Sequence, residues 1–142
     1  MAIIVDAYNV LHRTHRLPEP YALMDVAALC RLLERSRWAR RRAMVVCDGV
    51  RKPTEGAYEC PVELIYAGPG GKADPLIEKL IERDDGPRDL AVVSDDNRLR
   101  RAARRRGATA MRAEDFLREL VASADGHDEP GPPEKPESMG ST

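Results

Sequence analysis

Ala2-Ile3-Ile4-Val5-Asp6 decides the fold, because it is a short β-branched run that ends in an acid. Similar apolar runs follow at 43–48, 62–67 and 90–94, and a weaker one lies at 107–111. Their length and β-branched content predict five strands. Strands that are almost entirely apolar are typical of a parallel sheet with both faces covered.

Amphipathic stretches separate these strands. Apolar residues recur at helical spacing in 22–41, and a stripe of leucine and isoleucine runs through 76–81. Further helices are predicted over 96–106 and 114–122, with a short helical turn after Asn9. The alternation of strands and helices predicts an α/β fold, a three-layer α/β/α sandwich with a mainly parallel sheet of about five strands.

The length of 142 residues suits a single hydrophobic core. We assign it to residues 1–124, and we expect the acidic, Pro-rich and Gly-rich segment 125–142 to be a disordered tail. The sequence has neither an apolar run long enough to span a membrane nor a secretory signal, which predicts a cytoplasmic protein without a membrane partner. The three widely spaced cysteines are interpreted as small buried hydrophobes, because their number and spacing support neither a disulfide framework nor a zinc site.

The net charge of −1 hides clusters of arginine. Five arginines fall within 35–42 and six within 98–106, the second cluster including Arg98 and Arg101. Guanidinium groups suit bidentate contact with phosphate, although solvated helix faces have the same composition. The polar stretch 49–56 is predicted to be a mobile, basic loop that carries Arg51 and Lys52.

Acidic residues follow the predicted strands. Asp6 ends the first, Asp48 the second and Asp95 the fourth, with Asp96 beside it, while Asp74 opens the helix after the third. In a parallel sheet these positions share one edge, the edge at which ligands bind. Carboxylates gathered there repel one another unless a cation compensates them, and oxygen ligands favour Mg²⁺ or Mn²⁺, which can activate water for attack on a phosphodiester.

Each of these positions also has a structural interpretation. Asp74 before Pro75 is a good helix N-cap, and taken alone capping is the favoured reading. Asp6 has no capping role unless a helix starts immediately after it. Asn9 could give an oxygen to the metal or cap a helical turn. Capping or turn chemistry is the alternative for Asp48, Ser94, Asp95 and Asp96.

Three other signals are weak. The run 68–72 lacks the spacing and the Ser or Thr of a phosphate loop, so no nucleotide cofactor is predicted, although Lys72 could meet a phosphate. His12 and His15 are interpreted as surface histidines. Trp38 could stack on a base, but a lone tryptophan on an amphipathic helix is more often part of the core.

Four ordered motifs resemble those of the YacP-like group of NYN-domain proteins, relatives of the PIN-domain nucleases. The resemblance covers about residues 2–120. The motifs are Ile3-Ile4-Val5-Asp6-Ala7-Tyr8-Asn9-Val10, Val45-Val46-Cys47-Asp48-Gly49, Ala67-Gly68-Pro69-Gly70-Gly71-Lys72-Ala73-Asp74, and Val92-Val93-Ser94-Asp95-Asp96 with Leu99-Arg100-Arg101 and Arg106-Gly107-Ala108.

The resemblance implies a PIN-like fold and a metal-dependent endoribonuclease, with ribosome-linked RNA cleavage in some members. It implies metal-binding, catalytic roles for Asp6, Asp74 and Asp95, with Asp96 as a further metal ligand. It implies supporting roles for Asn9, Asp48 and Ser94. Ala7 stands where the family often has Gly, and Pro75 where many members have a second acid.

From this we predict a ribonuclease that uses Mg²⁺ or Mn²⁺. The residues expected to hold the RNA are Arg51, Lys52, Lys72, Arg98 and Arg101. A haloacid-dehalogenase-like phosphatase is a rival interpretation, but it needs a second Asp where Tyr8 stands. The other rival is an RNA- or ribosome-binding module with a weakened site, which Pro75 favours.

Overall fold

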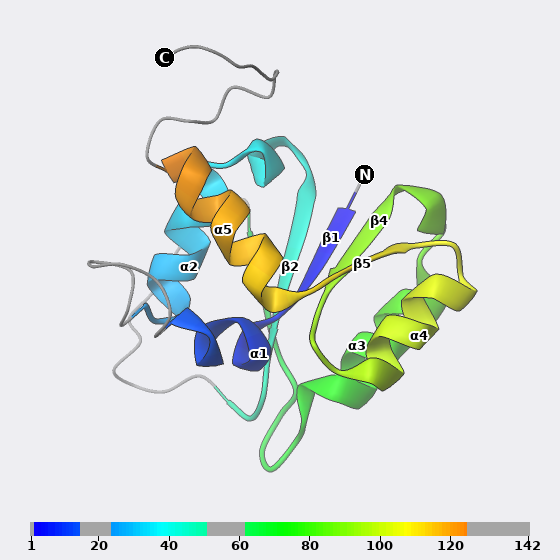
Figure 1. Cartoon of the computed structure of the whole chain (residues 1–142). Helices are drawn as coiled ribbons and strands as arrows, with labels where there is room; N and C mark the ends of the chain where they lie inside the picture. The colour runs from blue at the N-terminus through cyan, green and yellow to red at the C-terminus, as the bar shows by residue number, and fades with distance from the viewer. Residues whose placement is uncertain (1, 15–23, 51–61, 125–142) are drawn as a thin grey trace.

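The computed structural model describes residues 2–14, 24–50 and 62–124 (Figure 1). In chain order its elements are β1 (Ala2–Asp6), α1 (Ala7–His12), α2 (Val26–Glu34), the 3-10 helix η3 (Arg37–Arg40), β2 (Arg42–Cys47), β3 (Glu63–Tyr66), α3 (Ala73–Arg83), the 3-10 helix η5 (Pro87–Asp89), β4 (Leu90–Val93), α4 (Asn97–Arg105), β5 (Thr109–Met111) and α5 (Ala113–Ala124).

The five strands form one parallel sheet in the order β3-β2-β1-β4-β5, which confirms the predicted fold class. The strand β2 lies beside β1, and β3 lies beside β2. The chain then crosses to the other side of β1, where β4 and β5 lie. The strand order therefore reverses between β1 and β4. In open α/β sheets the crevice at such a point, outside the carboxyl ends of the strands, is where ligands bind.

Helices cover both faces of the sheet (Figure 1). One face packs against α1, α2 and α5, and its core includes Val5, Leu29 and Phe116, all fully buried. The other face packs against α3 and α4, with Ile4 and Ile77 in its core. Alternate residues of β1 thus serve opposite cores, which is why the strand has no polar position before Asp6.

The long helix predicted over 22–41 is wrong in its extent. Asp25 caps α2, accepting a hydrogen bond from the Ala28 amide at 2.9 Å, and the helix ends at Glu34. Ser36 then begins η3, because its Oγ accepts from the Trp38 amide at 3.0 Å and donates to the Leu33 carbonyl at 2.8 Å. A serine that satisfies backbone groups in this way competes with the helix and ends it.

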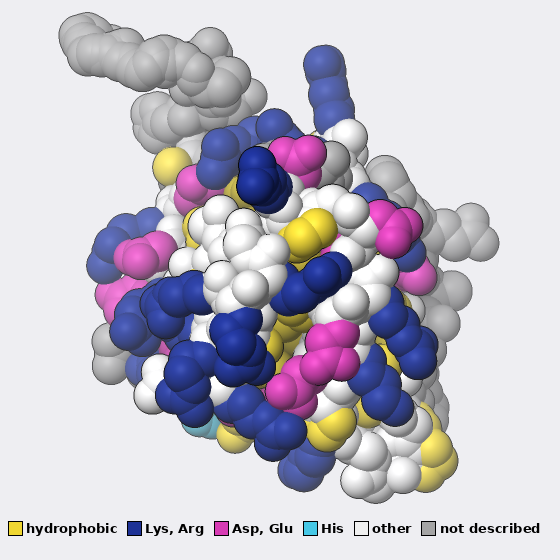
Figure 2. Space-filling view, turned by 90° about the vertical axis from the view of Figure 1, so that its right-hand side faces the viewer, with side chains coloured by type: hydrophobic (Ala, Val, Ile, Leu, Met, Phe, Trp, Pro, Cys, Tyr) yellow, Lys and Arg dark blue, Asp and Glu magenta, His cyan; other side chains and the backbone are white. Residues whose placement is uncertain are grey.

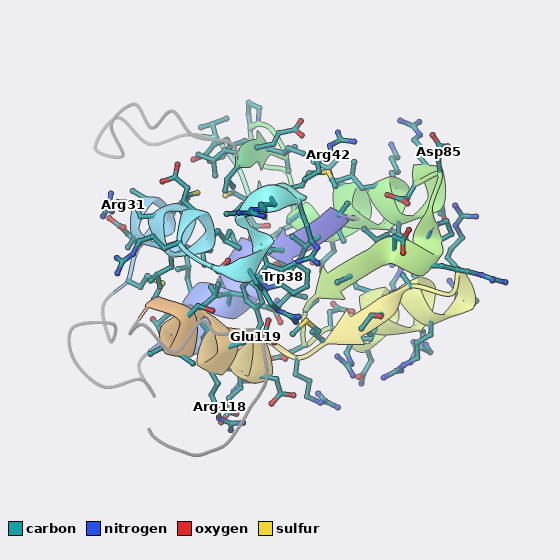
Figure 3. The ribbon with its side chains drawn as sticks, turned by 90° about the horizontal axis from the view of Figure 1, so that it is seen from above. Arg31, Trp38, Arg42, Asp85, Arg118 and Glu119 are labelled. Atoms are coloured by element: carbon teal, nitrogen blue, oxygen red, sulfur yellow. The ribbon has the colours of Figure 1, made fainter. Side chains whose placement is uncertain are left out.

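Trp38 belongs to the core. It is 3% exposed, and its indole N–H donates to Glu119 of α5 at 3.1 Å (Figure 3). The Arg37 guanidinium lies over the ring at 4.6 Å and also bonds Glu119. This burial rules out the alternative that the tryptophan stacks on a base.

Cys30 and Cys47 are buried, as expected of small hydrophobes in the core. No helix within the described ranges is both long enough and apolar enough to cross a membrane. The predicted basic loop with Arg51 and Lys52, His15, Cys60 and the predicted tail 125–142 lie outside the described residues.

Candidate active site at the carboxyl edge of the sheet

Asp6 stands at the centre of this edge. The helix α1 does start immediately after it, and Asp6 is its N-cap, with a long 3.5 Å hydrogen bond from the Asn9 amide to Oδ1. The other carboxylate oxygen, Oδ2, accepts from Asn9 Nδ2 at 2.9 Å and from Ser94 Oγ at 3.0 Å. Residues from β1, α1 and the end of β4 therefore fix this side chain, which is only 1% exposed.

Burial raises the pKa of Asp6 from its ordinary value of 3.8 to about 6. The hydrogen bonds from Ser94 and Asn9 oppose this rise, whereas the nearby charges of Asp74 and Asp48 add to it. A carboxylate that is costly to ionise at the point where the strand order reverses is a marker of a functional site.

Asp48 caps the next helix from a distance. It follows β2, is itself exposed, and its Oδ1 accepts a hydrogen bond from the Ala73 amide at 2.7 Å, at the start of α3. The loops after β2 and β3 are joined by the Gly49 amide, which donates to the Gly71 carbonyl at 3.0 Å. A Cβ on Gly71 would lie 2.7 Å from the Ala67 carbonyl oxygen, so this junction requires glycine.

The interpretation of Asp74 as an N-cap is therefore wrong. The helix α3 begins one residue earlier, at Ala73, and its cap position is Lys72, which makes no side-chain cap bond. Because Asp48 supplies the capping oxygen, the carboxylate of Asp74 is left in the first turn of the helix. Pro75 follows it there and is exposed.

Asp74 and Asp96 form a close pair of like charges. Burial raises the pKa of Asp74, and the charges of Asp96 and Asp48 raise it further. Asp96 is near enough to hydrogen-bond with Asp74, and it also caps α4 through the amides of Arg98 at 2.8 Å and Leu99 at 3.3 Å. Capping accounts for part of the role of Asp96, but it does not offset this mutual repulsion.

These side chains line one cleft of about 460 Å³, which we call the acidic cleft. It contains four carboxylates and one lysine, so negative charge prevails in it. Tyr8 lies at its rim, 57% exposed and stacked on His12 with ring centroids 5.0 Å apart. The lining residues are Asp6, Tyr8, Asn9, Asp48, Lys72, Asp74 and Asp96.

The grouping expected for Asp95 needs a correction. Its backbone amide donates to Asn9 Oδ1 at 3.0 Å, but its carboxylate lies in a neighbouring pocket. There it accepts from Arg13 Nε and from the Ala113 amide, each at 3.0 Å. The chain bends at Asp95, and the two consecutive side chains line different pockets: Asp96 lies in the acidic cleft and Asp95 lies outside it.

Of the residues predicted to hold RNA, Lys72 lines the acidic cleft. Arg98 and Arg101 are exposed on α4, and Arg98 is ion-paired with Glu78 at 2.9 Å. Figure 2 shows lysine and arginine side chains gathered over the face formed by α3 and α4. The arginines of α4 belong to the cluster that the sequence shows within 98–106. Arg51 and Lys52 lie outside the described residues.

Sequence reasoning missed Arg13 and Arg112, which border the pocket of Asp95. A helix that begins directly after Asp6 would have pointed to Arg13. Asn9 and Arg13 are four residues apart, so a helix places both on one face. No comparable signal exists for Arg112, which reaches the pocket only because β5 lies beside β4.

Comparisons with known proteins agree with this architecture. The family model of the YacP-like NYN domain matches residues 3–139. A crystal structure of Rae1 (YacP) from Bacillus subtilis is 21% identical, with a TM-score of 0.67, and covers 92% of this chain and 79% of that one. A crystal structure of a single-site mutant of the same protein gives 21% identity, a TM-score of 0.58, and coverage of 88% and 77%.

A search of curated proteins finds no match. The two solved structures are too distant in sequence to establish more than a shared fold. The family model, in contrast, extends over nearly the whole chain, including every motif from which the resemblance was drawn. The chain therefore belongs to the YacP-like NYN domain family, and it has the PIN-like fold of ribonuclease-type domains.

Proposed function

We propose that this protein is a metal-dependent endoribonuclease that hydrolyses RNA phosphodiester bonds in the acidic cleft. The observation that carries the proposal is the convergence of four carboxylates on one cleft at the point where the strand order reverses. One of them, Asp6, is buried with a pKa raised to about 6. This arrangement costs stability by itself, and a bound cation would offset the cost.

The donor chemistry of the cleft fits Mg²⁺ or Mn²⁺, because every candidate ligand is an oxygen. In the described parts of the chain, no three His, Cys, Asp or Glu side chains are arranged to hold a metal ion. Mg²⁺ needs no such cage, since it usually keeps several waters and binds one or two carboxylates together with substrate phosphate. Asp74 and Asp96, the closely paired carboxyls, would hold it.

Asp6, Asp48 and Asn9 would then act on the same ion through its waters. When bound, the cation supplies a lowered pKa for a water molecule and compensation for phosphate charge. Asp95 carries the family's expected metal role only as a prediction, because its carboxylate lies with Arg13 in this structure.

The chain's own residues divide the remaining work. Ser94 and Asn9 hold Asp6 Oδ2, whereas Oδ1 accepts a long 3.5 Å bond from the Asn9 amide, so Oδ1 is the oxygen that can accept a further proton. Oδ1 accepts the proton of the water that attacks phosphorus, and a pKa near the working pH suits a general base. As the new P–O bond forms, the bond to the leaving ribose oxygen breaks. The ammonium group of Lys72 neutralises charge on the phosphate.

RNA as the substrate is supported by family membership and by the exposed arginines of α4. Two further parts of the proposal come from the sequence analysis. Association with the ribosome rests on the family resemblance, and a cytoplasmic location rests on the sequence itself. The second candidate is an RNA-binding module without activity. It is favoured by Pro75 at the site of a second acid and by the lack of a preformed metal cage in the described residues.

The experiment measures turnover of labelled single-stranded and structured RNA in Mn²⁺, in Mg²⁺ and in chelator. Wild type, Asp74→Asn and Asp96→Asn are purified identically, so a contaminating ribonuclease contributes equally to each. The nuclease predicts cleavage that requires metal and falls at least a hundredfold in either variant, in line with the loss of preorganised catalytic groups. Equal, chelator-resistant rates in all three proteins would refute the enzyme and leave the binding module.

A further inference from the structure

A second pocket, which we call the arginine pocket, lies next to the acidic cleft. It has a volume of about 380 Å³ and is lined by Arg13, Asp95, Asn97, Arg112 and Glu114. Asn9 forms the partition, since its Nδ2 donates to Asp6 in the cleft and its Oδ1 accepts from the amide of Asp95. The helices α1 and α5 pack against each other (Figure 1), and Arg13 and Glu114, at the ends of these helices, both line the pocket.

The arginines of this pocket have N–H groups that are available to a ligand. Arg13 uses Nε for Asp95, and its side chain is 39% exposed. Arg112 is exposed and has no ion pair among the described residues. Of the two acids in the pocket, Glu114 is already paired with Arg118 at 2.9 Å. Asp95 therefore faces two arginines and also accepts the Ala113 amide.

A third guanidinium, that of the buried Arg100 on α4, adds positive charge near the pocket. Arg100 is only 7% exposed, and its guanidinium makes a 3.4 Å hydrogen bond from Nη1 to the Ser94 carbonyl. Burial lowers the pKa of Arg100, and the charges of Arg112 and Arg104 lower it further. An arginine remains protonated even so. The carboxylates of Asp95 and Asp115 offset only part of these effects, and Arg100 forms no ion pair among the described residues, so its positive charge favours anions in this region.

We propose that the pocket between Arg13 and Arg112 binds a backbone phosphate of the RNA, adjacent to the phosphodiester that lies in the acidic cleft. The proposal rests on the proposed ribonuclease function and names its substrate contact. Asp95 is a positioning residue, because its carboxylate holds Arg13 by Nε and leaves the terminal N–H groups of that arginine for phosphate. Arginine forks match phosphate in a bidentate geometry.

The two sites are one residue apart along the chain. Asp96 faces the acidic cleft and Asp95 faces the arginine pocket, so a strand of RNA that crosses Asn9 passes from one to the other. Successive phosphates of the strand would meet first a site that repels anions until a cation is bound, and then a site that attracts them. The arginine pocket would therefore hold RNA even in the absence of metal.

The test is binding of a fluorescent single-stranded RNA to the full chain in chelator, followed by anisotropy across a salt series. Arg112→Ala is compared with wild type, with Arg112→Lys and with Arg88→Ala. Arg88 is a matched control, since it is exposed on η5, before β4 and so at the opposite edge of the sheet. We expect Arg112→Ala to weaken binding about tenfold, as for a lost charge-assisted hydrogen bond.

The slope of log affinity against log salt should also flatten by about 0.7 in Arg112→Ala, the value for one phosphate contact on a single strand. Arg112→Lys should restore the slope, and Arg88→Ala should match wild type. A general loss of structure would not produce this pattern, because the lysine variant would then fail as well. Affinity and slope in Arg112→Ala equal to those of wild type, or absence of measurable RNA binding by wild type, would overturn the proposal.

Asp95→Asn separates positioning from metal binding. Loss of the carboxylate that holds Arg13 should weaken RNA binding in chelator several-fold even though a negative charge is removed, and should leave stabilisation by Mn²⁺ intact. Loss of that stabilisation, as in Asp74→Asn, would place Asp95 with the metal and overturn its positioning role. Since binding is measured without metal, failure of the pocket and failure of the nuclease are distinguishable. If the wild type cleaves RNA and Arg112→Ala binds RNA as tightly as the wild type does, the arginine pocket is rejected and the nuclease is not.

Discussion

Asp6→Asn tests whether the buried carboxylate of Asp6 costs stability when no metal is bound. In the folded protein the Asp6 carboxyl keeps its proton up to a pH of about 6, whereas in the unfolded chain it loses the proton near its ordinary pKa of 3.8. Between these values the folded state binds more protons than the unfolded state. The free energy of unfolding therefore falls as the pH rises through this window, and it is constant above it as far as Asp6 is concerned.

The size of the effect follows from the pKa. A change from 3.8 to about 6 corresponds to about 3 kcal/mol, at 1.36 kcal/mol per pKa unit. The variant has no proton to lose at this position, so it lacks this penalty. A fixed cost remains, because an asparagine has a single oxygen: placed at the Oδ2 position it keeps the bonds from Ser94 Oγ and Asn9 Nδ2, but its own N–H group then faces the Asn9 amide that Oδ1 accepted. That cost does not depend on pH.

The assay is urea unfolding of wild type and Asp6→Asn in chelator, at intervals from pH 3.5 to pH 7.5. Stability of the variant relative to wild type should increase by about 3 kcal/mol between the two ends of this range. Asp25→Asn is the matched control, since Asp25 also caps a helix but is exposed. A difference between Asp6→Asn and wild type that is independent of pH, or that shrinks as pH rises, would refute the reasoning.

Three further predictions concern the same edge of the sheet. Mn²⁺ at 100 times its dissociation constant should stabilise wild type by about 2.7 kcal/mol, and Asp96→Asn should lose most of this in a thermal melt; equal shifts would place the metal elsewhere. Asp48→Ala should cost about 1 kcal/mol in urea unfolding, because the Ala73 amide loses its cap, whereas Asp48→Asn should cost less; identical stabilities would contradict the cap. Asp95→Ala should cost about 1–3 kcal/mol, since the buried Ala113 amide loses its acceptor, and a loss below 0.5 kcal/mol by the same assay would show that this bond contributes little.

The order of the elements and the edge on which the acids lie could be predicted from the sequence. Apolar runs such as 2–6 and 90–93, each followed by an amphipathic helix, permit few folds other than a covered parallel sheet. In such a sheet every strand ends at the same edge, so an acid that follows a strand has its edge determined by local sequence alone. The same reasoning succeeded for the stripe of α3, because its period is strong and local.

Local signals failed where a distant residue competes for a role. Asp74 before Pro75 is typical of a cap, but Asp48, 25 positions before Ala73, accepts the hydrogen bond from the Ala73 amide and leaves Asp74 for the cleft. In the same way Arg13, 82 positions from Asp95, draws that carboxylate out of the cleft, while Asp96 enters it. The sequence by itself determined which strands carry acids and at which edge they end. Only the tertiary structure decided which acids face one another, because that depends on partners that folding alone brings within hydrogen-bonding distance.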